Sequence, residues 1–204
     1  MTAIYENYES PWMDDELSIL RDAANRFFST EFVPHKDRWI EQGKVDRDAW
    51  NKAGEAGLLC AEIPAQYGGG GGDYRHETIV TEEQLGAGIS GFGNQVHSQI
   101  VAPYLLHYGN EEQKQKWLPK MATGEMVGAI AMTEPNTGSD LQNVKTSATK
   151  KGDSYVINGA KTYITNGIHA DLVVLVAKTD PNLGAKGISL IMVCLLYTSP
   201  SPRD

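Results

Sequence analysis

The sequence has few cysteines, few basic residues and no long apolar run. Its two cysteines, Cys60 and Cys194, cannot form a disulfide framework or a cysteine metal site, which indicates a reducing compartment. The 18 basic residues against 26 acidic ones give a net charge of −8, which argues against nucleic acid and anionic membranes as partners. No apolar stretch approaches membrane-spanning length, so we expect no membrane span.

Targeting and metal-binding patterns are also absent. Residues 1–6 show neither the basic-then-apolar plan of a secretory signal nor an Arg-rich mitochondrial plan. We therefore expect a cytoplasmic protein of bacterial type, or a mitochondrial matrix protein if the source is eukaryotic. The five histidines have no metal-ligand spacing, so we expect no metal and interpret them as surface or satisfied core residues: His35, His76, His97, His107 and His169.

Helical patterns fill the first part of the chain, up to about residue 125. Apolar residues recur at helical spacing from Leu17 to Phe28, and Pro34 must kink or divide that helix. Further helices are predicted over 46–57 with Asp46 as N-cap, from Asp73 to Leu85, from Asn94 to Tyr108, and from a capping box at Asn110 to near Gly124.

Two glycine-containing segments interrupt these helices. The run Gly68 to Gly72 lacks the spacing and the Gly-Lys-Ser/Thr ending of a phosphate loop, which favours a flexible loop. The small residues of 86–93 predict a place where another group approaches the backbone closely.

After residue 125 the pattern becomes that of short strands bounded by turn residues. Strands are predicted at 127–133, 144–150, 155–157, 161–165, 172–177 and 188–193. We therefore predict an α+β fold: an N-terminal all-α helical domain over 1–125 and a middle β-domain over 126–193 that forms an antiparallel sheet or barrel.

The stretch from Val127 to Asp140 is the most informative part of the chain. It predicts a buried strand that ends in a turn at Pro135, where Gly138 can take a positive φ. Backbone N–H groups and the hydroxyls of Thr133, Thr137 and Ser139 suit a phosphate or the edge of a polar heterocycle. From the residues alone, these hydroxyls and that of Thr165 can equally satisfy backbone groups, and Tyr163 can be a half-buried sheet residue. Glu134, which precedes a proline in a turn, is more typical of an exposed or loop-structuring residue than of a catalytic base.

Two motifs carry a resemblance to a known family. They are Met132-Thr133-Glu134-Pro135-x-x-Gly138-Ser139-Asp140 and Asn158-Gly159-x-Lys161-x-Tyr163-Ile164-Thr165-Asn166-Gly167. With the helical half before them, they resemble the acyl-CoA dehydrogenases, closest to the long-chain branch, from about Trp12 to Val193. The resemblance implies that the family's C-terminal helical bundle, which carries the catalytic base, is missing, so we assign no catalytic residue to this chain.

The resemblance also implies which residues bind FAD. Ile130, Ala131, Met132 and Thr133 would lie along the isoalloxazine, and Gly138 and Ser139 would meet the pyrophosphate, Ser139 also approaching the acyl-CoA substrate. In the second motif, Tyr163 would pack on the ring and Thr165 would bond near N5, with Ile164 between them. Thr137 and Tyr163 depart from the family's usual smaller residue and Trp. His97 and Gln99, on a helix that lines the acyl cavity in the family, are candidates for substrate contact.

The implied activity is the oxidation of fatty acyl-CoA to trans-2-enoyl-CoA, by α-proton abstraction and β-hydride transfer to FAD. An electron-transfer flavoprotein would accept the electrons, and the full-length protein would form a homo-tetramer or homo-dimer. The chain as it stands is expected to be inactive. Two alternatives stay open: an acyl-CoA oxidase on the same scaffold, and a non-catalytic module that binds flavin or acyl-CoA.

The last residues, 194–204, shift in composition toward Ser and Pro. We interpret them as a non-native tail from a sequencing or gene-model artefact, with a disordered Ser/Pro-rich terminus as the alternative.

Overall fold

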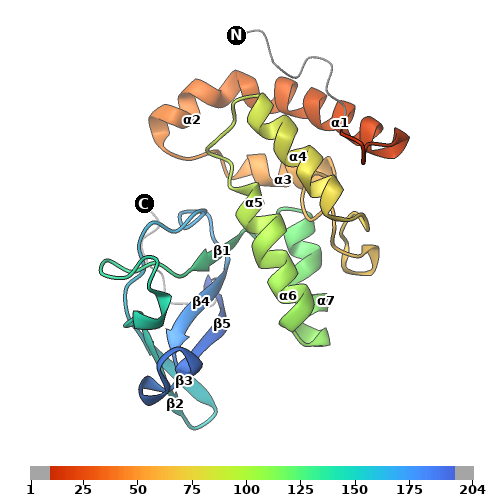
Figure 1. Ribbon diagram of the computed structural model, residues 1–204. Coiled ribbons are helices and arrows are strands. Elements are labelled where there is room, and N and C mark those ends of the chain that lie inside the picture. The colour runs from red at the N-terminus through yellow and green to blue at the C-terminus, as the bar shows by residue number, and fades with distance from the viewer. Residues whose placement is uncertain (1–9, 196–204) are drawn as a thin grey trace.

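A computed structural model describes residues 10–195, with a helical half followed by a sheet half (Figure 1). The α-helices are α1 (Asp15–Phe27), α2 (Lys36–Gln42), α3 (Asp48–Glu55), α4 (Tyr74–Gly86), α5 (Asn94–Val96), α6 (Ala102–Tyr108) and α7 (Glu111–Ala122). This order confirms the predicted α+β fold class. Within 10–195, no helix is long and apolar enough to cross a membrane.

Most helix ends lie where the local sequence predicts them. The Asp73 carboxylate accepts a hydrogen bond from the N–H of Arg75, and Asn110 and Gln113 form the expected capping box. A π-helical turn (Phe28–Phe32) and a 3-10 turn (Val33–His35) separate α1 from α2 around Pro34, as predicted. The cap predicted at Asp46 is wrong, because that carboxylate bonds Arg38 instead and Arg47 precedes α3.

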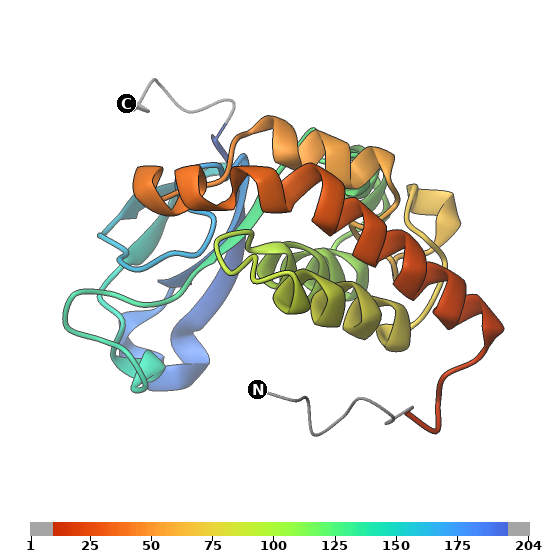
Figure 2. The same cartoon turned by 90° about the horizontal axis from the view of Figure 1, so that it is seen from above.

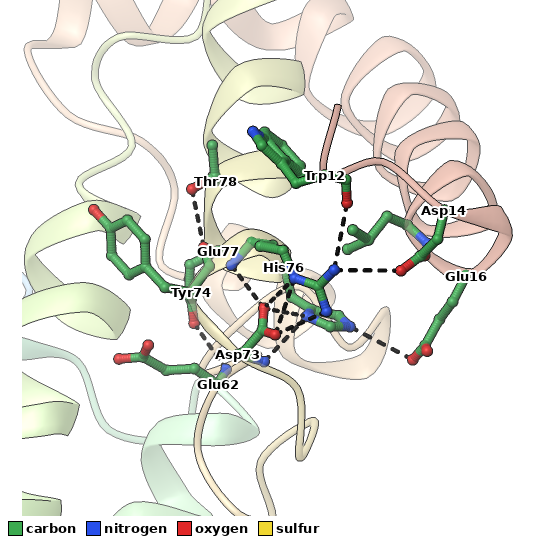
Figure 3. A network of polar contacts seen from close by, with 11 residues as sticks. Trp12, Asp14, Glu16, Glu62, Asp73, Tyr74, His76, Glu77 and Thr78 are labelled. Atoms are coloured by element: carbon green, nitrogen blue, oxygen red, sulfur yellow. Dashed lines mark hydrogen bonds and ion pairs between the residues drawn. The ribbon is translucent and has the colours of Figure 1, made fainter. Parts of the chain in front are cut away.

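The starts of α1 and α4 are tied together by polar contacts. Arg75 on α4 reaches the Asp14 carboxylate at 3.4 Å and the Trp12 carbonyl at 3.3 Å, both just before α1. Figure 3 shows Trp12, Asp14 and Glu16 gathered beside Asp73 and His76. Each of these residues is within or beside the first turn of its helix, so the network fixes how α1 lies along α4.

The sheet contains β1 (Gly128–Ala131), β2 (Ser147–Lys151), β3 (Ser154–Asn158), β4 (Leu172–Lys178) and β5 (Ile188–Cys194). β4 pairs with β5 and β2 pairs with β3 antiparallel, whereas β1 and β2 both run parallel to β4. The sheet is therefore mixed and not purely antiparallel as predicted. Alternation of side chains marks a strand but does not specify its partner, and β1 pairs with a strand more than forty residues later.

Two buried apolar clusters form the core. One lies within the helical half around Phe28, Phe32, Trp50 and Phe92. The other joins the halves, since residues of α6, α7 and the π-helical turn η4 (His97–Val101) pack against Leu172 and Val174 of β4: Val101, Leu105, Leu118 and Met121. Figure 2 shows the sheet standing beside the helices, in agreement with this shared cluster.

The first two residues of the expected non-native tail, 194–204, are bonded to the sheet or to the residue before β4. Cys194 pairs with Leu172 in the sheet, and the N–H of Leu195 donates to the Asp171 carbonyl at 2.8 Å. The rest of that tail, residues 196–204, lies outside the described residues.

Candidate functional site

The loop that follows β1 is closed by a tight turn. The N–H of Glu134 donates to the Thr137 carbonyl at 2.9 Å, and the N–H of Thr137 donates back at 3.0 Å, with Pro135 at the exposed tip. Gly138 lies just outside this turn without the positive φ that the sequence allowed. A Cβ atom added to Gly138 would meet no protein atom within 4 Å, so the space beside it is open to a ligand.

Glu134 stabilises this loop from behind. Its carboxylate is buried and accepts hydrogen bonds from the N–H of Lys145 at 2.6 Å, the N–H of Thr146 at 2.8 Å and the Lys161 ammonium at 2.9 Å. Burial opposes ionisation, but these hydrogen bonds outweigh it and lower the pKa of Glu134 to about 2. The loop-structuring interpretation is confirmed, while an exposed position is wrong.

Lys161 brings the two sequence motifs side by side. Its ammonium also donates to the Met132 carbonyl at 2.9 Å, and the N–H of the next residue, Thr162, donates to the Thr133 carbonyl at 3.0 Å. Both carbonyl groups are thus engaged by the second motif. The N–H and hydroxyl of Thr133 are the polar groups of this residue that remain for a ligand.

The segment after Lys161 is irregular, so the strand predicted at 161–165 is wrong. Tyr163 and Asn166 have positive φ angles of 56° and 65°, which a strand does not accommodate. The Asn166 amide fixes the segment by donating to the carbonyls of Gly93 at 2.9 Å and Gly128 at 3.1 Å. Tyr163 is 93 % exposed, not half-buried, so its ring face is open to a partner.

The hydroxyls of Thr133, Ser139 and Thr165 are among those that make no hydrogen bond to another described residue. Thr137 differs, because its hydroxyl donates to the Asn143 carbonyl at 3.3 Å and its side chain is buried. Thr137 therefore structures the loop and is not among the ligand-facing donors. Unpaired donors together with an exposed aromatic ring fit a flavin, which has a polar pyrimidine edge and a flat apolar ring.

The other expected site residues lie on or just after β1 and in the second motif. Ala131 is buried, and Ile130, Met132 and Ile164 are partly buried. Ile130 packs against the cluster that joins the two halves. In the sequence, Met132 adjoins Thr133 and Ile164 adjoins Thr165.

A groove of about 260 Å³ runs between the second motif and the helical half. It is lined by residues of the segments 43–45, 90–93 and 164–169, among them Thr165. Sequence reasoning missed segment 43–45, which has no motif. It did predict a close approach within 86–93, and a Cβ at Gly93 would lie 2.1 Å from Asn166 Oδ1.

His97 and Gln99 are engaged within the protein. His97 is fully buried: its Nε2 donates to the Met121 carbonyl at 3.0 Å and its Nδ1 accepts from the N–H of Gly128 at 2.9 Å. Burial lowers the pKa of His97 to about 4, so the ring is neutral and joins helices to β1. This confirms the satisfied-core interpretation for His97 and leaves it no atom for substrate. Gln99 donates to Thr81 Oγ1 at 2.6 Å.

Comparison with known proteins relates both halves to one family. The model of the acyl-CoA dehydrogenase N-terminal domain matches residues 14–125, and that of the middle domain matches 129–199. The long-chain specific acyl-CoA dehydrogenase of mouse mitochondria is 44 % identical over 180 residues, which cover 87 % of this chain and 42 % of the mouse protein.

Solved structures of acyl-CoA dehydrogenases also resemble this chain. An acyl-CoA dehydrogenase from Geobacillus kaustophilus superposes with a TM-score of 0.88 at 46 % identity, covering 91 % of this chain and 50 % of that one. The acyl-CoA dehydrogenase from Bacillus anthracis, solved with FAD, gives a TM-score of 0.84 at 33 % identity, covering 96 % and 34 %. The chain thus spans half or less of the proteins it matches. It belongs to the acyl-CoA dehydrogenase family.

Proposed function

We propose that this chain is the flavin-binding part of an enzyme that oxidises fatty acyl-CoA to trans-2-enoyl-CoA. The observation that carries the proposal is the set of free hydroxyls and the exposed Tyr163 ring on two adjoining loops. Thr133, with the backbone of Ile130 to Met132, would hold the pyrimidine edge of FAD. Gly138 and Ser139 would hold its pyrophosphate.

When bound, FAD would accept the β-hydrogen of the acyl chain as hydride. The chain's own residues would orient the ring: Tyr163 by packing on its face, and Thr165 by donating from its hydroxyl near the reactive edge. Ser139, which is exposed, would also contact the acyl-CoA.

Removal of the α-proton needs a carboxylate base, and we assign none within residues 10–195. Glu134 is ionised but enclosed by three donors. Glu77 is fully buried on α4. We therefore expect the chain alone to bind FAD without turnover, the base being supplied by a further part of the protein.

The partners belong to the same proposal. Dehydrogenation requires an electron acceptor, for which we propose an electron-transfer flavoprotein, and we expect a homo-dimer or homo-tetramer of the complete enzyme. The mouse relative is mitochondrial by name, so a mitochondrial matrix or bacterial cytoplasmic location is proposed. The relatives reported above are dehydrogenases, which favours that activity over an acyl-CoA oxidase.

The test joins residues 1–195 to the C-terminal half of the Geobacillus protein and adds acyl-CoA of graded chain length without oxygen. Bleaching of the bound flavin is expected, followed by slow reoxidation in air. Fast reoxidation would indicate an oxidase instead. A folded chimera that binds FAD but is bleached by no acyl-CoA would leave only a non-catalytic binding module.

A further inference from the structure

Two opposite charges are buried together behind the loop that follows β1. The Glu134 and Lys161 side chains are 5 % and 10 % exposed, and Oε1 and Nζ lie 2.9 Å apart. A buried ion pair is costly to desolvate unless each charge has further hydrogen-bond partners. Here the carboxylate has two backbone N–H donors, and the ammonium has the Met132 carbonyl.

These contacts tie three separate segments to one point. Glu134 belongs to the loop after β1, the N–H donors of Lys145 and Thr146 precede β2, and Lys161 belongs to the second motif. The segments lie up to 29 residues apart in the chain. Loss of the Glu134 carboxylate would release the loop from the segment before β2 and from the Lys161 ammonium, whereas loss of the Lys161 ammonium would remove the side-chain contacts between the loop and the second motif.

We infer that Glu134 and Lys161 are a positioning pair. They hold the carbonyl of Met132 toward the second motif and thereby fix the neighbouring Thr133 with its N–H and hydroxyl as the groups offered to a ligand. Neither residue contacts substrate itself. The identity of the ligand rests on the proposed function, whereas the ordering of the loop does not.

The opposite end of β1 offers a matched control. There Arg47 Nη2 lies 3.2 Å from Asp171 Oδ2, which also accepts from the N–H of Val127. The Asp171 side chain is 7 % exposed, close to the value for Glu134. Arg47 itself is 37 % exposed, against 10 % for Lys161, so Arg47→Met breaks a pair with a similarly buried carboxylate and a more exposed cation, without touching the loop after β1.

The first test measures amide hydrogen exchange in peptides covering 132–139, and needs no flavin. Lys161→Met and Glu134→Gln are expected to accelerate exchange there at least about tenfold, since each breaks a hydrogen bond to a charged group. Arg47→Met is expected to leave it within about twofold. Wild-type exchange in both variants, or equal acceleration in Arg47→Met, would overturn the inference.

The second test titrates FAD into the same chains. Lys161→Met is expected to weaken binding about tenfold, and Lys161→Arg to recover it to within about threefold, because Arg keeps a cation and N–H donors. General destabilisation would not give this recovery. Binding by Lys161→Met within about twofold of wild type would contradict the pair's role toward flavin. If the wild type binds no FAD, the proposed function fails, and the exchange result alone decides the pair.

Discussion

Glu77 on α4 is a carboxyl group with no exposed surface. One oxygen accepts from the N–H of Glu62 at 3.3 Å, and the other has no hydrogen-bond partner in the described part of the chain. Burial raises the pKa of Glu77 to about 7, which is more than the backbone hydrogen bonds from Glu62 and Ala61 can offset, and the nearby Glu62 carboxylate adds a smaller upward contribution. The folded protein therefore retains a proton that the unfolded chain loses at lower pH.

This predicts that stability falls as pH rises. The Glu77 contribution is fully present below pH 4.5, is lost as pH rises to about 7, and stays constant above that. Glu77→Gln removes the dependence and keeps the shape. Urea unfolding at pH 5 and pH 8 should show the wild type losing about 2–3 kcal/mol relative to Glu77→Gln. If the stability of the two proteins depended equally on pH, the buried Glu77 carboxyl would not be the cause of the loss.

Tyr163 is a second residue whose environment makes a clear prediction. Because its side chain is 93 % exposed, Tyr163→Ala removes little packing within the protein. We expect a melting temperature within about 1 °C of wild type, but FAD binding weaker by about five- to tenfold through the lost aromatic contact. Thermal unfolding and FAD titration of the same sample separate the two effects. A lower melting temperature with unchanged flavin affinity would assign Tyr163 to the fold.

Among the helices, α7 begins with a capping box that is formed by two residues three positions apart. Asn110 Oδ1 accepts from the N–H of Gln113 at 2.9 Å, and Gln113 Oε1 accepts from the N–H of Asn110 at 2.9 Å. Asn110→Ala should lower the free energy of unfolding by about 1 kcal/mol, and Glu112→Ala, which alters no cap, by clearly less. Chemical unfolding measures both. Equal losses would show that the cap contributes nothing specific.

Capping and periodicity also explain how much of the fold was predictable. The starts of α4 and α7 depend on residues within three positions, so the sequence predicts them. The failed cap at Asp46 depends on Arg38, eight residues away. The parallel pairing of β1 with β4 depends on still more distant partners, which no local pattern specifies.

In the candidate site, too, the features that depend on nearby residues were predictable and those that depend on distant partners were not. Its residue types were visible in two motifs, but their arrangement depends on Lys161 reaching back to Met132 and on Asn166 reaching Gly93. Those long-range hydrogen bonds replace the predicted strand with an irregular segment. They also expose Tyr163, which propensity alone places in a sheet.

At the scale of the whole molecule, Arg47 joins the two halves. It donates to the carbonyls of Gly124 at 2.8 Å and Glu125 at 2.6 Å, and pairs with Asp171. Arg47→Met should lower the free energy of unfolding by about 2–3 kcal/mol, because the Asp171 carboxylate stays buried. Arg38→Met, which breaks an exposed pair with Asp46, should lower the free energy of unfolding clearly less than Arg47→Met does. Calorimetry that ranks the two variants the other way would contradict this assignment.

The most direct test of the proposed flavin site is an equilibrium titration of the 204-residue chain with FAD. One FAD per chain is expected, and Thr133→Val and Thr165→Val should each weaken it about fivefold through one lost hydrogen bond. Thr78→Val, whose hydroxyl donates only within α4, should leave the affinity unchanged. Absence of saturable binding, or equal affinity in all four proteins, would contradict the assignment of a flavin site to these two loops.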